Sequence, residues 1–158
     1  MTKAMRRLRA IDGFTLVELM VVVLIIGILV GIALPTFLGA RARAQDSAAK
    51  STVRTALAAG RVIFSTEENY AAATIVALRD VDDSVRWVDE VTTSAEPTTV
   101  SRDTAGGILI LAAYSHSRSC FFLSDDPPND TEFGVLPDVD STDCSADQAP
   151  SVTFGSSW

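Results

Sequence analysis

The sequence contains few of the residues on which catalytic and metal sites commonly depend. It has one histidine and two cysteines among 158 residues. A Ser-His-Asp arrangement would have to use His116, which lies in a serine-rich turn. The sequence shows no phosphate-binding loop, no glycine-rich dinucleotide turn and no zinc-ligand spacing. We therefore expect a protein that is not an enzyme and that holds no cofactor and no metal.

Two acidic groups, in residues 80–83 and 125–130, are the only candidates for a cation site in the sequence. Carboxylate and amide oxygens are the ligands that calcium prefers. Neither group follows the spacing of an EF-hand loop, however. We interpret both groups as solvated acidic surface.

One long apolar run lies near the N-terminus, from residue 16 to residue 34, and Glu18 is its only charged residue. A hydrocarbon core about 30 Å thick requires roughly 20 apolar residues in a helix, so this run is long enough to cross a membrane. A short positive leader precedes it, with Lys3, Arg6, Arg7 and Arg9. The leader should stay in the cytoplasm, which places the rest of the chain outside. An ordinary secretory signal is the alternative, but its apolar region would be shorter and would not contain a carboxylate.

An exported chain favours a disulfide, and with two cysteines the intramolecular pairing must be Cys120 with Cys144. Two free thiols are the alternative. The bond would tie the acidic, proline-bearing loop 125–150 back to the strand at Cys120, and it would stabilise the fold by about 3 kcal/mol.

The apolar periodicity predicts one long helix from residue 14 to about residue 66. Gly27, Gly31 and Pro35 should bend it or open it locally, because proline removes one hydrogen-bond donor and crowds the preceding turn. Residues 71–78 should form a short helical turn. Residues 84–100, 108–111, 119–124 and 133–135 have strand-like patterns, and residues 152–158 should close the edge of the sheet. We expect three or four antiparallel strands packed on the helix.

The residues Gly13-Phe14-Thr15-Leu16-Val17-Glu18, after a positive leader and before an apolar run that ends at Pro35, resemble the class III signal of type IV pilins and pseudopilins. The resemblance is strong over residues 6–40 and looser over 41–70. It implies an α+β type IV pilin fold: a long N-terminal helix, kinked near Pro35, on a small antiparallel sheet with a disulfide-bounded C-terminal loop. The Cys-Phe-Phe-Leu strand and the final tryptophan resemble a major pilin of high-GC Gram-positive bacteria.

The resemblance also implies how the chain is processed. A prepilin peptidase would cut between Gly13 and Phe14 and methylate the new amine of Phe14. Glu18 would then be the fifth mature residue. Its carboxylate would pair with the Phe14 amine of a neighbouring subunit and so select the correct register, because an unpaired charge in hydrocarbon is costly. In the alternative, Glu18 only reaches the lipid interface. The segment with Gly27, Gly31 and Pro35 would unwind in the filament or, in the alternative, form an ordinary kink.

The resemblance divides the chain into four parts: a leader (1–13), a transmembrane or filament-core helix (14–36), an amphipathic stem helix (37–66) and a globular head (67–158). The leader carries a net charge of +3, residues 37–66 carry +4 and residues 67–158 carry −13. We expect the cations of the stem to pair with acidic heads of adjacent subunits. Contact of these cations with nucleic-acid phosphates is the alternative, which the sequence does not specifically indicate.

The function that follows is structural. We expect a single-pass precursor in the cell membrane and then a surface filament that serves adhesion, twitching motility or DNA uptake. Its partners would be identical or homologous subunits, the prepilin peptidase and methyltransferase, an inner-membrane assembly platform and, before assembly, membrane lipid. Two alternatives remain: a pseudopilin or minor pilin of a secretion or competence system, and an anchored surface binding module that does not polymerise.

Overall fold

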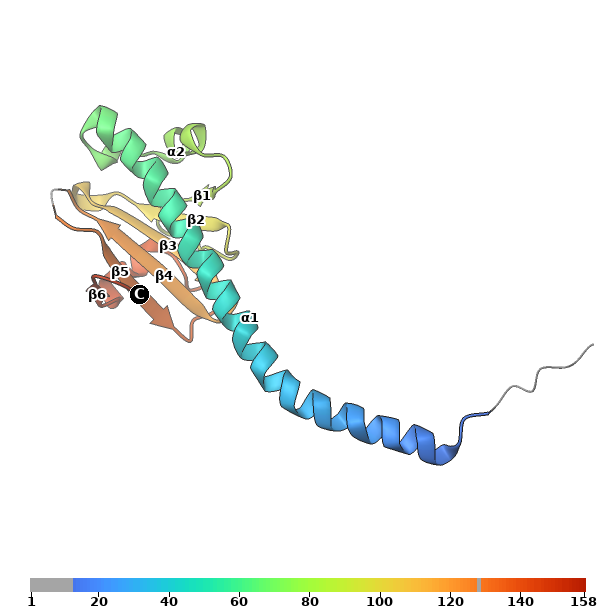
Figure 1. The fold of residues 1–158 in the computed structure, drawn as a ribbon. Coiled ribbons are helices and arrows are strands. Elements are labelled where there is room, and N and C mark those ends of the chain that lie inside the picture. Colours follow the sequence, from blue (N-terminus) through green and yellow to red (C-terminus); the bar gives the residue numbers. More distant parts are fainter. Residues whose placement is uncertain (1–12, 128) are drawn as a thin grey trace, which may run out of the picture. The chain divides into compact units, whose positions relative to one another are not determined.

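The computed structural model describes residues 13–127 and 129–158 of the chain (Figure 1). The chain divides into two compact units, of which the first ends at Gly39 and the second runs from Ala40 to Trp158. The second unit contains the sheet and the part of the long helix that packs on it.

The helix α1 runs from Leu16 to Glu67 and has 52 residues, so the predicted helix over 14–66 is confirmed to within two residues. Its second half is rich in alanine, the residue with the highest helix propensity. Pro35 lies inside the helix. It cannot donate to the carbonyl of Gly31, and the next residue, Thr36, donates its hydroxyl to the carbonyl of Ile32 at 3.4 Å.

The helix ends where the backbone turns left-handed at Glu68, with φ of 53°. A 3-10 turn, η1 (Tyr70–Ala72), follows, and the Asn69 side chain accepts from the backbone N–H of Ala71 at 2.8 Å. The short helix α2 (Ile75–Val81) begins at Thr74, whose hydroxyl accepts from the N–H of Ala77. The predicted helical turn over 71–78 therefore corresponds to two separate elements, each with its own cap.

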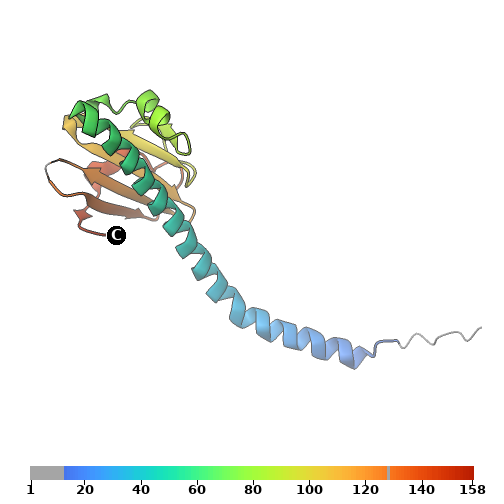
Figure 2. The ribbon, with the colours of Figure 1, turned by 45° about the horizontal axis from the view of Figure 1, so that its top comes forward.

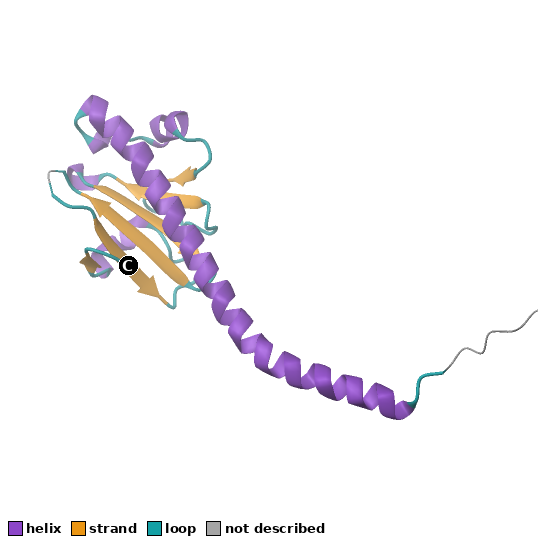
Figure 3. Cartoon of the chain, in the orientation of Figure 1, coloured by secondary structure: helices purple, strands orange, loops and turns teal. Residues whose placement is uncertain are grey.

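The sheet has six strands in sequential order (Figure 3). They are β1 (Arg86–Val88), β2 (Thr99–Asp103), β3 (Leu109–Ser115), β4 (Ser119–Asp125), β5 (Glu132–Pro137) and β6 (Phe154–Gly155). A 3-10 turn, η2 (Ala105–Gly107), lies between β2 and β3, and another, η3 (Ala146–Ser151), precedes β6.

The sheet differs from the expectation in two respects. It has six strands instead of three or four, and β1 pairs with β2 in parallel, while the other four pairs are antiparallel. The predicted strand over 84–100 is broken because residues 89–98 form the connection that returns the chain to the start of β2. Parallel neighbours require such a crossover, whereas a tight turn would have made them antiparallel.

Within the second unit, α1 covers one face of the sheet (Figure 2). The helix lies close to the sheet at Gly60, because a Cβ atom at this position would lie 2.3 Å from Cδ2 of Leu109. The buried residues of this layer come from α1, from β2 to β4 and from the segment between them, and they include Ala49, Val53, Ala56, Ile63, Tyr70, Leu78, Val100, Leu109, Leu111, Phe121 and Leu123.

The opposite face of the sheet is covered by the C-terminal segment, including η3. The disulfide between Cys120 on β4 and Cys144 fastens this segment to the sheet, with Cα atoms 5.4 Å apart. The predicted pairing is therefore confirmed. The second unit has three layers: helix, sheet and disulfide-bounded loop, as the predicted α+β class requires.

Candidate functional site

The predicted processing residues lie immediately before α1. Gly13 and Phe14 precede the helix and are exposed, with 83% of Phe14 accessible. The leader residues 1–12 lie outside the described part of the chain. Exposed backbone outside a helix or strand is a preferred site of proteolytic cleavage, so the position of this bond is compatible with the predicted processing.

Thr15 and Glu18 form a capping box at the start of α1. The Thr15 backbone N–H donates to Oε2 of Glu18 at 3.0 Å, and the Thr15 hydroxyl donates to the same oxygen at 2.9 Å. In return, the N–H of Glu18 donates to the Thr15 hydroxyl oxygen at 3.1 Å. Helix starts leave such N–H groups without partners inside the helix, and this reciprocal pair satisfies two of them.

Our sequence reasoning missed this cap, although its signal is present as Thr15-x-x-Glu18 before an apolar run. The finding gives Glu18 a local role besides the predicted intersubunit one. Within a single chain, the carboxylate has two hydrogen-bond donors close by. The cost of bringing it into hydrocarbon is lower when such donors are present.

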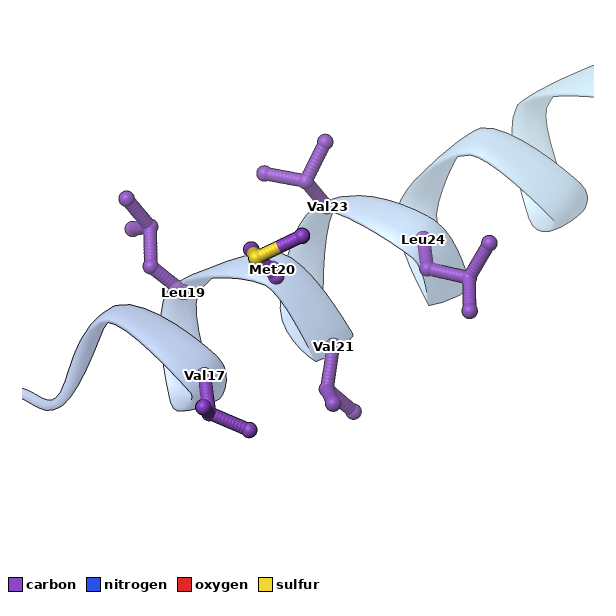
Figure 4. A pocket seen from close by; sticks show the side chains of 6 residues that line it. All are labelled: Val17, Leu19, Met20, Val21, Val23 and Leu24. Carbon is purple, nitrogen blue, oxygen red and sulfur yellow. The ribbon is translucent and has the colours of Figure 1, made fainter.

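The first half of α1 presents apolar side chains on all sides. Its most apolar window of 18 residues has a mean hydropathy of 3.0, and none of that window is buried. Figure 4 shows side chains that project from different sides of the helix around a shallow hollow, namely those of Val17, Leu19, Met20, Val21, Val23 and Leu24. This hollow is the open surface of one helix. An apolar surface of this extent requires a cover of lipid or protein.

Gly27, Gly31 and Pro35 lie inside this apolar segment, and all three have helical backbone. A Cβ atom added at Gly27 or Gly31 would meet no atom within 4 Å, so neither glycine is required by packing within the chain. The predicted unwinding of this segment in a filament remains a prediction.

A second cluster fixes the far end of α1 to the sheet. The side chain of Asp125 at the end of β4 is 2% exposed, and its Oδ1 accepts from Nη2 of Arg61 at 2.6 Å and from the Thr131 hydroxyl at 2.6 Å. Its Oδ2 accepts from Nε of Arg61 at 3.3 Å and from the hydroxyl of Tyr70. The Asp125 carboxylate therefore accepts four hydrogen bonds, which leaves it little capacity for a cation.

These contacts shift the pKa of the Asp125 carboxyl and the pKa of the Tyr70 phenol. Burial raises the pKa of the Asp125 carboxyl, but the hydrogen bonds from Arg61, Thr131 and Tyr70 outweigh it and keep that pKa below its ordinary value. Burial, and then the bond to Asp125, raises the pKa of the Tyr70 phenol. The cluster is thus a carboxylate, a neutral phenol and a guanidinium over the whole physiological pH range.

Two further stem cations contact aromatic rings of the second unit. The Lys50 ammonium lies 4.9 Å from the centre of the Phe121 ring, and the Arg54 guanidinium lies 4.8 Å from that of Trp158. The Trp158 indole N–H donates to the carbonyls of Phe122 and Gly134. With Arg61, three of the five stem cations have partners in their own chain, whereas we had expected the stem cations to face other subunits.

The remaining sequence candidates are structural. His116 lies in an exposed turn 3.3 Å from Glu96, consistent with a surface turn. Tyr70, Trp87 and Tyr114 are buried, so their rings are not available to stack on bases. On the helix, Asp46 accepts hydrogen bonds from the hydroxyls of Ser115 (2.7 Å) and Ser117, which fixes the turn between β3 and β4.

Comparisons with known proteins agree with the N-terminal features. Residues 8–34 match the family model of the prokaryotic N-terminal methylation motif. The chain is 46% identical over 59 residues to the type IV major pilin protein PilA of Myxococcus xanthus, a match that spans 37% of this chain and 27% of that protein. It is 32% identical over 108 residues to the type IV major alpha-pilin of Moraxella bovis, which spans 64% of this chain and 68% of that one. No solved structure matches the chain significantly.

Proposed function

Because this chain belongs to the type IV pilin family, we propose that it is a structural subunit of a surface filament, assembled through the first half of α1. One observation carries the proposal: an exposed apolar helix surface that begins at a capped carboxylate, in a chain whose sheet is already covered on both faces. Family membership also supports a structural protein and not an enzyme.

In the precursor, lipid covers the apolar surface. The exposed apolar residues from Leu16 to Leu38 extend over about 35 Å of helix, which matches a bilayer core with a small tilt. The positive leader stays on the cytoplasmic side, so the second unit folds outside, where the disulfide between Cys120 and Cys144 can form.

In the filament, the same surface of other subunits replaces the lipid. Hydrolysis of the peptide bond between Gly13 and Phe14 by a prepilin peptidase removes the leader and leaves an amine on Phe14, to which a methyl group is transferred. That amine lies one residue before Thr15, whose N–H and hydroxyl donate to the carboxylate of Glu18. In a staggered bundle it can reach the Glu18 of a neighbour, and only one stagger satisfies both charges.

Electron microscopy of material sheared from cells, with the subunit identified by mass spectrometry, tests this function. We expect filaments that contain this chain. A Gly13→Leu variant should accumulate as uncleaved precursor in the membrane and should give no filaments. If the mature chain is found only as a membrane monomer, it is an anchored surface module and the proposal is wrong.

A further inference from the structure

The charged residues of α1 within the second unit fall into two groups. Those of the first group contact their own sheet or its loops: Asp46, Lys50, Arg54 and Arg61. The others, Arg41, Arg43 and Glu67, are exposed and make no ion pair, side-chain hydrogen bond or ring contact with any residue that the structure describes. Glu68, directly after the helix, is exposed in the same way.

The second group is divided by sign between the two ends of this helical segment. The cations Arg41 and Arg43 lie at its start, and the carboxylates of Glu67 and Glu68 lie at its end. Between Arg43 and Glu67, the exposed residues other than Arg54 and Arg61 carry no charge: Ala44, Ser47, Ala48, Ser51, Thr55, Ala58, Val62, Ser65 and Thr66. At 1.5 Å per residue, the two charged ends are about 36–39 Å apart.

A helix cannot bring its own ends together, and no residue in the described part of the chain pairs with these four charges, so they are free to pair with another molecule. We propose that Arg41 and Arg43 pair with Glu67 and Glu68 of further copies that lie parallel to the first and are displaced along the helix axis by about 36–39 Å. Residues two apart on a helix point to nearly opposite sides, so the two arginines face different copies. Such a contact joins different surfaces of the two copies. Because the copies are also displaced along the axis, such a heterologous contact does not close into a ring and generates an open helical assembly. The inference rests on the proposed filament and specifies one of its subunit contacts.

The cations alone are also compatible with a lipid surface, since they follow the exposed apolar residues within five positions. Phosphate groups of lipids would account for Arg41 and Arg43. They would not account for two unpaired carboxylates at the opposite end of the segment, in a region whose residues 67–158 already carry a net charge of −13. A second copy of the chain accounts for both ends.

Charge reversal in the full-length chain tests the pairing. One variant carries Arg41→Glu and Arg43→Glu, a second carries Glu67→Arg and Glu68→Arg, and a third combines all four changes. Each of the first two should reduce the yield of sheared filaments about two- to fivefold, because the loss of one exposed ion pair changes an equilibrium by about that factor. The combined variant should recover most of the wild-type yield. Added salt should also reduce the wild-type yield, because the pairs are exposed.

The matched control is Arg79→Glu on α2, which reverses another exposed arginine that has no ion pair among the described residues. It should leave the yield unchanged. Folding is checked by the unfolding transition of each variant in detergent, which should coincide with that of the wild type because all four changed residues are exposed. As an independent readout, a chain with Arg43→Cys and Glu67→Cys should form a ladder of crosslinked subunits on oxidation in filaments, and one with Thr55→Cys and Glu67→Cys should not.

Four results would overturn the inference. Reversal at either end could leave the yield unchanged, or the combined variant could assemble as poorly as the worse of its two parents. The stem reversal alone could reduce insertion of the precursor into vesicles that contain anionic lipid, without rescue by the second pair, which would assign Arg41 and Arg43 to lipid. Finally, a wild-type chain that forms no filaments would overturn the proposed function together with this inference. If the wild type forms filaments but the combined variant does not recover the lost yield, this inference alone is wrong.

Discussion

The guanidinium of Arg61 on α1 and the carboxylate of Asp125 at the end of β4 are joined by two hydrogen bonds, of 2.6 Å and 3.3 Å. At the other end of the contact between α1 and the sheet, Asp46 accepts a hydrogen bond from the hydroxyl of Ser115, the last residue of β3. Asp46 and Arg61 are about 22 Å apart along the helix, and β4 is about 20 Å long. These two polar contacts therefore fix the helix against the whole length of the strand.

Removal of one partner of this pair should destabilise the second unit. Arg61→Ala leaves the buried Asp125 carboxylate with only the hydroxyls of Tyr70 and Thr131. Because Arg61 is itself 56% exposed, we expect a loss of about 2 kcal/mol in the free energy of unfolding, less than for a fully buried pair. Guanidinium unfolding of the full chain in detergent measures the loss, and Arg79→Ala should change it little. Equal stability of Arg61→Ala and the wild type would contradict the role of the pair.

The same cluster should make stability depend on pH at both extremes. Asp125 has a lowered pKa in the folded chain, so its contribution is present above its ordinary value of 3.8 and is lost as the pH falls through the folded pKa. Tyr70 has a raised pKa, so its contribution is complete below its ordinary value of 10.0 and declines as the pH rises above it.

Unfolding measured from pH 2 to pH 7 tests the acidic side. Asp89, whose pKa is lowered by hydrogen bonds from Thr92, contributes in the same direction. The informative comparison is therefore between the wild type and Asp125→Asn, which should be less stable at pH 7 and should lose less stability on acidification. Parallel curves for the two proteins would contradict the assignment.

The contact between α1 and β3 requires the absence of a side chain at Gly60. In Gly60→Ala, the new methyl would meet Cδ2 of the fully buried Leu109, so overpacking should exceed the gain in helix propensity and destabilise the chain by about 1 kcal/mol. Gly39→Ala is the control, because a Cβ atom there meets nothing within 4 Å. Thermal unfolding in detergent compares them, and a stabilised Gly60→Ala would show that the helix has room to move away.

Two substitutions of Glu18 separate its local and intersubunit roles. Glutamine preserves the capping box but not the charge, whereas alanine removes both. If the carboxylate pairs with the Phe14 amine of a neighbour, both variants should be cleaved and both should assemble poorly, as judged by immunoblots of sheared material. Normal assembly of Glu18→Gln would restrict Glu18 to capping.

The helix and the disulfide were predictable because their signals are local or countable. The period of the apolar residues determines α1, and two cysteines permit only one intramolecular bond. The capping box has an equally local signal in Thr15-x-x-Glu18, but we interpreted Glu18 only through its charge in the membrane and not through its spacing from Thr15. By contrast, Arg61 and Asp125 are 64 residues apart, and no spacing indicates that they meet. The same applies to the cations over Phe121 and Trp158 and to the parallel pairing of β1, which depends on the path of a loop.

The mass of the subunit in purified surface filaments tests the central claim most directly. We predict a chain that begins at Phe14, carries one methyl group on its amine and retains the disulfide between Cys120 and Cys144. A filament subunit that still carries the leader, or a processed chain recovered only from the membrane fraction, would contradict the account.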